Sequence, residues 1–240
     1  MSDTGTGNDE EEGTSSSSLG RTNDEAQIVV SHTAIAVLCW DMLAYSFLVI
    51  SVFPYAGYMV VDLVPDADPD TVGSYAGWLA SAFHLGIVST AVLWGQAANV
   101  YGRKSVILVS FALMGTLSIL FGMAQSLVWA LATRMAMGMS CCIVATLKTL
   151  VSDLLNQENP AREAQAMNWM LGMWGWGFLI APVLSGFLAE PLQQYPQWFG
   201  KNEEDQHLPW MAAFLQKFPF ILPNILGLML SVTAMALTYS

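Results

Sequence analysis

The chain has 240 residues, of which 54% are hydrophobic and only 11% are charged, and its formal net charge is −11. A soluble domain carries about a quarter charged residues, so this composition excludes a globule covered by polar surface in water. Several apolar stretches exceed the roughly 18 residues that cross a bilayer as a helix, which indicates a polytopic membrane protein.

Residues 1–30 form a tail that differs from the rest of the chain. Its first 25 positions hold seven acidic residues against Arg21, among many Ser, Thr and Gly residues. Such a segment cannot bury enough apolar surface to fold, so we expect a disordered cytoplasmic tail. It has neither the cationic start nor the short apolar core of a signal peptide.

Six apolar segments follow, and each can cross a bilayer as an α-helix. We therefore expect an all-α fold with six transmembrane helices within residues 32–240. The predicted spans are residues 32–61, 75–99, 104–124, 127–152, 163–188 and 217–239.

The connections between spans differ in charge. The loop 61–74 has four acidic residues and no Lys or Arg, whereas the turn 99–104 and the loop 154–163 carry cations. Short loops rich in Lys and Arg stay cytoplasmic. We therefore expect these two cationic connections and the N-terminus on the cytoplasmic side.

Span one contains Asp41, the only acidic residue deep inside a predicted span. A carboxylate within the membrane is by default a candidate functional group, and a partner for it should be named. The alternative is that span one starts late, which would leave Asp41 at the level of the headgroups.

The turn between spans two and three reads GQAANVYGRK. A short turn between antiparallel helices needs a residue that tolerates positive φ, and Gly102 supplies it. Gly95 allows a neighbouring helix to approach closely, and Arg103 and Lys104 anchor the turn at cytoplasmic headgroups. Membrane topology alone could account for these features.

Span four carries two cations, Arg134 and Lys148. An arginine within a span is costly unless it faces a polar cavity or a partner; the alternative is that Arg134 reaches the outer surface. At 100° per residue, Lys148 lies within about 40° of Arg134 on an unbroken helix, roughly 21 Å further along. This spacing predicts a shared polar stripe, unless Lys148 is an ordinary anchor at the cytoplasmic end.

Small residues recur in span five, where Gly177, Pro182 and Gly186 lie in the run GFLIAPVLSG. Small residues at this spacing let two helices touch backbone to backbone, and proline provides a local kink. General glycine-rich packing is the alternative interpretation.

Three of these segments resemble motifs of the major facilitator superfamily. The turn is similar to G-x-x-A-D-R-x-G-R-K, although Asn99 stands where the family usually has Asp and Val100 where it often has Arg. Arg134 and Gly138 match the R-x-x-x-G of the same span. The span-five run resembles the G-x-x-x-G-P-x-x-G-G motif of proton-coupled exporters, with Ala181 and Ser185 in place of two glycines.

Within this superfamily, the segment from about residue 32 to 240 is similar to the zinc-induced-facilitator-like transporters and to fungal multidrug exporters. The resemblance implies two six-helix halves, each built of inverted three-helix repeats. The chain corresponds to the first half, so the expected partners are a second six-helix half, the lipid bilayer, a small solute and protons. We expect no cofactor, metal site, nucleic-acid partner or enzymatic activity.

The implied function is proton-coupled export of a small solute by alternating access, the solute being an organic compound, a drug-like molecule or a metal chelate. Spans one and four would line the cavity, with Asp41 facing Arg134 and with Lys148 on the same pathway. An alternative is an incomplete, non-transporting half-transporter that acts as an interaction or regulatory partner. The resemblance implies a cytoplasmic gate made of Gly95, Asn99, Gly102, Arg103 and Lys104, and helix-packing positions at Gly138, Gly177, Pro182 and Gly186.

Overall fold

The structure is a computed structural model of the chain, and it describes residues 32–64, 68–155, 160–195 and 209–240. The predicted tail, residues 1–30, lies outside these described residues.

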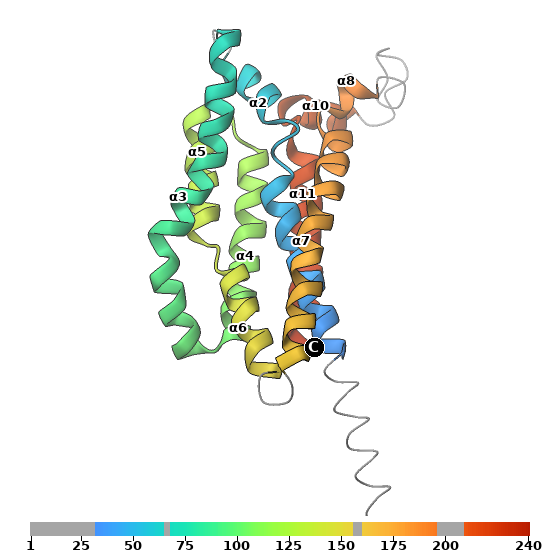
Figure 1. Ribbon diagram of the computed structural model, residues 1–240. Helices are drawn as coiled ribbons and strands as arrows, with labels where there is room; N and C mark the ends of the chain where they lie inside the picture. The colour runs from blue at the N-terminus through green and yellow to red at the C-terminus, as the bar shows by residue number, and fades with distance from the viewer. Residues whose placement is uncertain (1–31, 65–67, 156–159, 196–208) are drawn as a thin grey trace, which may run out of the picture.

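The described residues form an α-helical bundle without strands, which confirms the predicted all-α class. Six helical segments are long and apolar enough to cross a membrane. They run side by side along one axis (Figure 1). They are the first helix, His32–Ile50, then α3 (Pro69–Tyr101), α4 (Arg103–Gly122), α5 with α6 (Leu127–Met139 and Ile143–Leu155), α7 (Pro160–Leu188) and α11 (Ile221–Tyr239).

Three short helices gather at one end of the bundle, the end opposite the α3–α4 turn (Figure 1). They are α2 (Ala56–Leu63), α8 (Pro191–Gln194) and α10 (Pro209–Lys217). We call this the α2/α10 end, and the other the α3–α4 turn end.

The first helix lies inside the bundle. From Asp41 to Ile50, every residue except Leu43 is buried. A helix that is apolar on all sides is buried on all sides, and the sequence LCWDMLAYSFLVI meets this condition apart from its one acid. By contrast, α3 and α7 expose many large apolar side chains, among them Trp78, Leu85, Val88, Trp169, Trp176 and Leu179.

Span one is interrupted, whereas the sequence predicts a single helix over 32–61. The first helix ends at Ile50, residues 51–55 form turns, and α2 restarts the helix at Ala56. Pro54 has no N–H to donate, and its ring would clash with the carbonyl four residues earlier in a continuous helix. That carbonyl, on Ile50, accepts instead from Phe53 N at 3.1 Å.

Span four is interrupted as well, at residues 140–142 between α5 and α6. The three residues are Ser and Cys, so neither proline nor glycine causes the break. Non-helical backbone is tolerated at membrane depth only where its polar groups find partners, and here α3 and α4 provide them. Thr90 Oγ1 and Trp94 Nε1 donate to Met139 O (2.8 and 2.7 Å), and Ser110 Oγ donates to Ser140 O (2.7 Å) and accepts from Cys142 N (3.4 Å).

Candidate functional site

Asp41 is fully enclosed, with 0% of its surface exposed. Thr238 Oγ1 on α11 donates to Asp41 Oδ2 at 2.8 Å. The other carboxylate oxygen, Oδ1, is buried without a hydrogen-bond partner among the described residues. The intramembrane carboxylate therefore lies against span six and has one unsatisfied oxygen.

Arg134 is 2% exposed and reaches the end of the first helix. Its Nη2 donates to Val49 O at 3.2 Å, and its guanidinium carbon lies 5.2 Å from the Phe83 ring centroid and 5.3 Å from that of Phe121. Carbonyls in the last turn of a helix carry partial negative charge and lack intrahelical donors. Arg134 thus caps the C-terminal end of the first helix, at Ile50. This helix end exists only because span one is interrupted there.

The prediction that Asp41 and Arg134 face each other is wrong. Asp41 bonds to α11, whereas Arg134 bonds to Val49, eight residues further along the first helix and about 12 Å away along its axis. The one ion pair found within the described ranges joins Arg103 to Asp153. The prediction treated span one as unbroken to residue 61, so it did not contain the helix end that Arg134 caps.

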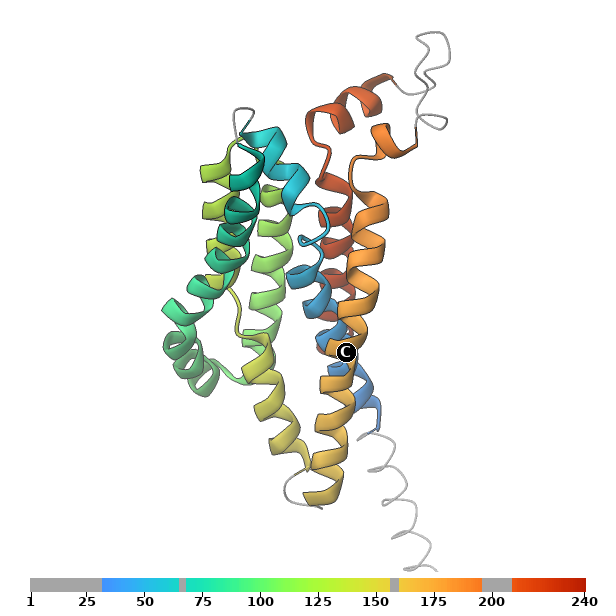
Figure 2. The same ribbon diagram turned by 45° about the horizontal axis from the view of Figure 1, so that its top comes forward.

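Lys148 does not share a helix face with Arg134 either. The break at 140–142 separates the two, so the count of 100° per residue does not carry from one to the other. Arg134 is enclosed, whereas Lys148 is exposed on α6 and lines a cavity of about 770 Å³ between α3 and α6. The lower part of α3 diverges from α6 there in both views (Figure 1, Figure 2).

The α3–α4 turn is tied to two other spans. Gly102 has φ 85°, a backbone conformation that glycine adopts without strain. Arg103 Nη1 pairs with Asp153 Oδ2 on α6 and also donates to the carbonyl of Thr149. Lys104 Nζ donates to the carbonyl of Tyr239, near the end of α11, at 2.9 Å.

The other two predicted gate residues, Gly95 and Asn99, lie on α3 and line the 770 Å³ cavity. A Cβ on Gly95 would meet nothing within 4 Å. The close helix contact expected at Gly95 is therefore not made by the described residues.

Gly138 lies in a backbone-to-backbone contact between α5 and α3. A Cβ on Gly138 would collide with the carbonyl oxygen of Phe83, and one on Gly86 would lie 2.7 Å from Met139 N. Each glycine therefore provides the space into which the opposite helix fits.

The span-five residues of the predicted packing motif make unequal contacts. A Cβ on Gly177 would collide with the hydroxyl of Ser46, whereas one on Gly186 would lie 3.8 Å from Pro54 Cβ, an ordinary contact. Pro182 lies inside α7, which continues through it from Pro160 to Leu188.

The sequence pattern of the Major Facilitator Superfamily matches residues 33–238. The chain belongs to this superfamily. It is 34% identical over 161 residues to the zinc induced facilitator 1 protein of Arabidopsis thaliana, covering 67% of this chain and 32% of that protein. It is 28% identical over 207 residues to the multidrug transporter mfsB of Aspergillus fumigatus, covering 86% and 32%.

A second Arabidopsis thaliana relative, zinc induced facilitator-like 1, is 32% identical over 173 residues, covering 72% of this chain and 34% of the relative. These matches confirm the resemblance to the superfamily and to this subgroup. The chain is an integral, multi-pass membrane protein, and it spans about a third of the length of the curated relatives it matches.

A buried polar network lies near the α2/α10 end, outside the superfamily motifs. Asn224 Oδ1 accepts from Ser118 Oγ at 2.8 Å, and Asn224 Nδ2 donates to Tyr55 Oη at 3.3 Å and to Phe220 O at 2.7 Å. Tyr55 stacks on Phe220 with ring centroids 5.3 Å apart. The sequence signal that could have predicted this network was Asn224, an amide within the apolar run ILPNILG.

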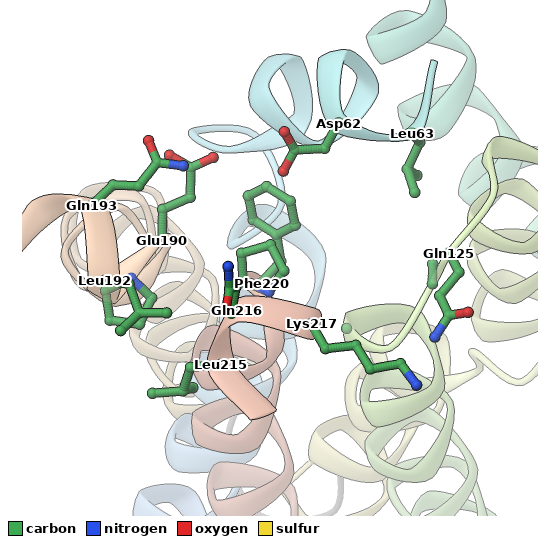
Figure 3. Close-up of a pocket in the computed structure, with 14 residues that line it drawn as sticks. Asp62, Leu63, Gln125, Glu190, Leu192, Gln193, Leu215, Gln216, Lys217 and Phe220 are labelled. Carbon is green, nitrogen blue, oxygen red and sulfur yellow. The ribbon is translucent and has the colours of Figure 1, made fainter. Parts of the chain in front are cut away.

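A cavity of about 810 Å³ opens at the α2/α10 end, between α2, the α4–α5 turn, the α7–α8 turn and α10 (Figure 3). Asp62 and Glu190 both line it. Partial burial raises the pKa of Asp62, and burial followed by the nearby charge of Asp62 raises the pKa of Glu190. Neither residue was a candidate predicted from the sequence, because both lie in connections between spans.

Proposed function

We propose that this chain forms one six-helix half of a transporter that exports a small organic solute or metal chelate, coupled to protons, by alternating access with a second six-helix half. The observation that carries the transport proposal is the superfamily match over residues 33–238. The Aspergillus fumigatus relative is named as a multidrug transporter and a relative in Aspergillus niger is named as an efflux pump, and these names support export of an organic solute.

Proton coupling rests on Asp41. Burying a carboxylate without a counter-charge is expensive, and one hydrogen bond from Thr238 satisfies only one of its oxygens. Binding a proton removes the charge and with it most of this cost. Asp41 would then carry a proton while enclosed and release it when α11 moves away and water reaches the carboxylate.

The α3–α4 turn contacts the same end of α11. Lys104 donates to the carbonyl of Tyr239, the residue after the Thr238 that bonds to Asp41. Movement of the turn would therefore act on the contact that encloses Asp41. This arrangement supports a gate at the turn that is linked to protonation, although Asn99 supplies no charge there.

The second half is proposed to cover the exposed faces of α3 and α7. Both helices present rows of large apolar side chains, and the 770 Å³ cavity opens beside α3. Lys148 and Asn99 would be the polar residues of this cavity that face the solute. Arg134 would hold the first helix in place and would not contact the solute.

We test transport by fusing this chain in place of the matched segment of the Aspergillus fumigatus multidrug transporter. Proton-driven efflux of a fluorescent drug from reconstituted vesicles is measured for the fusion and for this chain alone. We expect saturable efflux from the fusion and none from the chain alone. A correctly inserted fusion without efflux would refute the proposal and favour the non-transporting half-transporter.

Asp41→Asn in that fusion separates coupling from transport. It keeps the shape of the side chain and removes the titrating charge, so uphill efflux should fall to background while downhill exchange persists. Asp70→Asn, at an exposed acid near the start of α3, is the matched control. Uphill efflux by Asp41→Asn at the control rate would contradict the assignment of Asp41.

We also propose that the α3–α4 turn end is cytoplasmic, because the cations Arg103, Lys104 and Arg162 lie near it. In a cysteine-free background on intact cells, Asp68→Cys should react with an impermeant maleimide and Ser16→Cys should not. Labelling of Ser16→Cys alone would reverse the orientation.

A further inference from the structure

The cavity at the α2/α10 end has no part in the proposed transport step. Its volume of about 810 Å³ lies within the roughly 300–1,000 Å³ typical of small-molecule pockets. Its walls come from both three-helix repeats: α2 belongs to the first, and the α7–α8 turn and α10 belong to the second.

Two carboxylates point into this cavity from opposite repeats. Asp62 extends from α2, and Glu190 extends from the α7–α8 turn (Figure 3). Glu190 has φ 47°, a left-handed conformation that is costly for a residue with a side chain. A hydrogen bond from Glu190 N to Pro219 O, 3.1 Å long, holds that conformation. The turn therefore fixes a carboxylate beside a second one.

An aromatic ring lies next to the carboxylates. Phe220 lines the cavity, is 4% exposed, and is fixed by stacking on Tyr55 with an interplanar angle of 14°. Aromatic rings attract cations as well as apolar groups. Leu192 and Leu215 also line the cavity, below Glu190 in the view of Figure 3.

Lys217, the one cation among the described lining residues, does not neutralise the carboxylates. No ion pair joins it to Asp62 or Glu190 within the described ranges. Its side chain extends toward Gln125, away from Asp62 and Glu190 (Figure 3), and its Nζ lies 5.5 Å from the ring centroid of Phe218. The part of the cavity near Phe220 is thus negatively charged and partly apolar.

We propose that this cavity binds a small organic cation, with its ammonium group between Asp62 and Glu190 and its apolar part against Phe220. Charge-assisted hydrogen bonds to the carboxylates would supply the affinity. The proposal goes beyond transport, and it concerns a site that this chain forms alone, so its test does not depend on a second half.

The test is isothermal titration of the purified full chain in detergent, with phenethylamine as the probe. Its neutral analogue 2-phenylethanol and calcium chloride are titrated separately. We expect saturable binding of phenethylamine only, weakened about tenfold or more by Glu190→Gln and by Asp62→Asn, since each removes one charge-assisted interaction. Asp70→Asn, an exposed acid on α3, is the control and should bind as the parent does.

A second measurement uses the unmodified chain. Affinity for phenethylamine should fall as pH decreases, because protonation of the two carboxyl groups removes the charge that attracts the ammonium group. Equal binding of 2-phenylethanol, unchanged affinity in both variants, or affinity independent of pH would each overturn the proposal. Saturable calcium binding without phenethylamine binding would also overturn it, because the cavity would then be a metal site.

Discussion

Gly138→Ala tests the backbone contact between α3 and α5. The added Cβ would collide with the carbonyl oxygen of Phe83, and Gly86 Cα also lies 3.1 Å from its position. These obstacles are backbone atoms, so no side-chain rotation can relieve the collision and the two helices must separate. Overpacking costs about 1–3 kcal/mol, and the upper end applies to a backbone obstacle.

Alanine also gains roughly 0.5–1 kcal/mol over glycine inside a helix, so the net loss for Gly138→Ala is about 2 kcal/mol. For a chain of this size that corresponds to a fall in Tm of about 4–8 °C. The assay is thermal unfolding in detergent, followed by circular dichroism at 222 nm.

Variants at Gly172, Gly177 and Ser46 serve as controls. A Cβ on Gly172, also inside a helix, would meet nothing within 4 Å, so Gly172→Ala should raise Tm by the helix-propensity gain. The obstacle at Gly177 is the side chain of Ser46, so Ser46→Gly should partly restore the stability that Gly177→Ala loses. A Gly138→Ala protein as stable as the parent would refute the argument.

Three other predictions concern charged residues. Arg134→Ala should lower the unfolding free energy by about 2 kcal/mol or more, because a charge-assisted hydrogen bond to the Val49 carbonyl contributes about 1.5–3 kcal/mol. The unfolding free energy is measured by chemical denaturation, and a change under about 0.5 kcal/mol would contradict the capping role. Asp153→Asn should change stability by no more than about 1 kcal/mol in the same assay, since its pair with Arg103 is partly exposed, and a larger loss would show that the pair is a structural anchor. Burial and the charge of Asp62 raise the pKa of Glu190 in the folded chain. This shift stabilises the folded chain at low pH, and the stabilisation is lost as pH rises through the folded pKa. Glu190→Gln should therefore raise Tm at pH 8 but not at pH 4, and an equal shift at both values would contradict this.

The number and order of the spans could be predicted because length and apolarity alone decide whether a segment can cross a bilayer. The turn at Gly102 could also be predicted, since only glycine readily adopts the positive φ found there. Pro54 was a readable signal for the interruption of span one. The interruption of span four had no such signal, because Thr90, Trp94 and Ser110 stabilise it from distant parts of the sequence.

The environments of Asp41 and Arg134 could not be predicted from depth. Residue counting places a side chain along a helix axis, but the neighbour it meets depends on how each helix is rotated and which helix lies beside it. Asp41 contacts Thr238 and Arg134 contacts Val49 because segments that are far apart in the sequence pack together.

The interruption of span four also bears on how the protein enters the membrane. Each of α5 and α6 has 13 residues, or about 20 Å of helix, too short to cross a hydrocarbon core about 30 Å thick. We therefore expect Leu127–Leu155 to be inserted into the membrane as one segment. The hydrogen bonds that satisfy the interruption come from α3 and α4, so its polar backbone groups lack these partners until those spans pack against it. Ser110→Ala should then leave membrane insertion intact and lower the Tm of the assembled bundle.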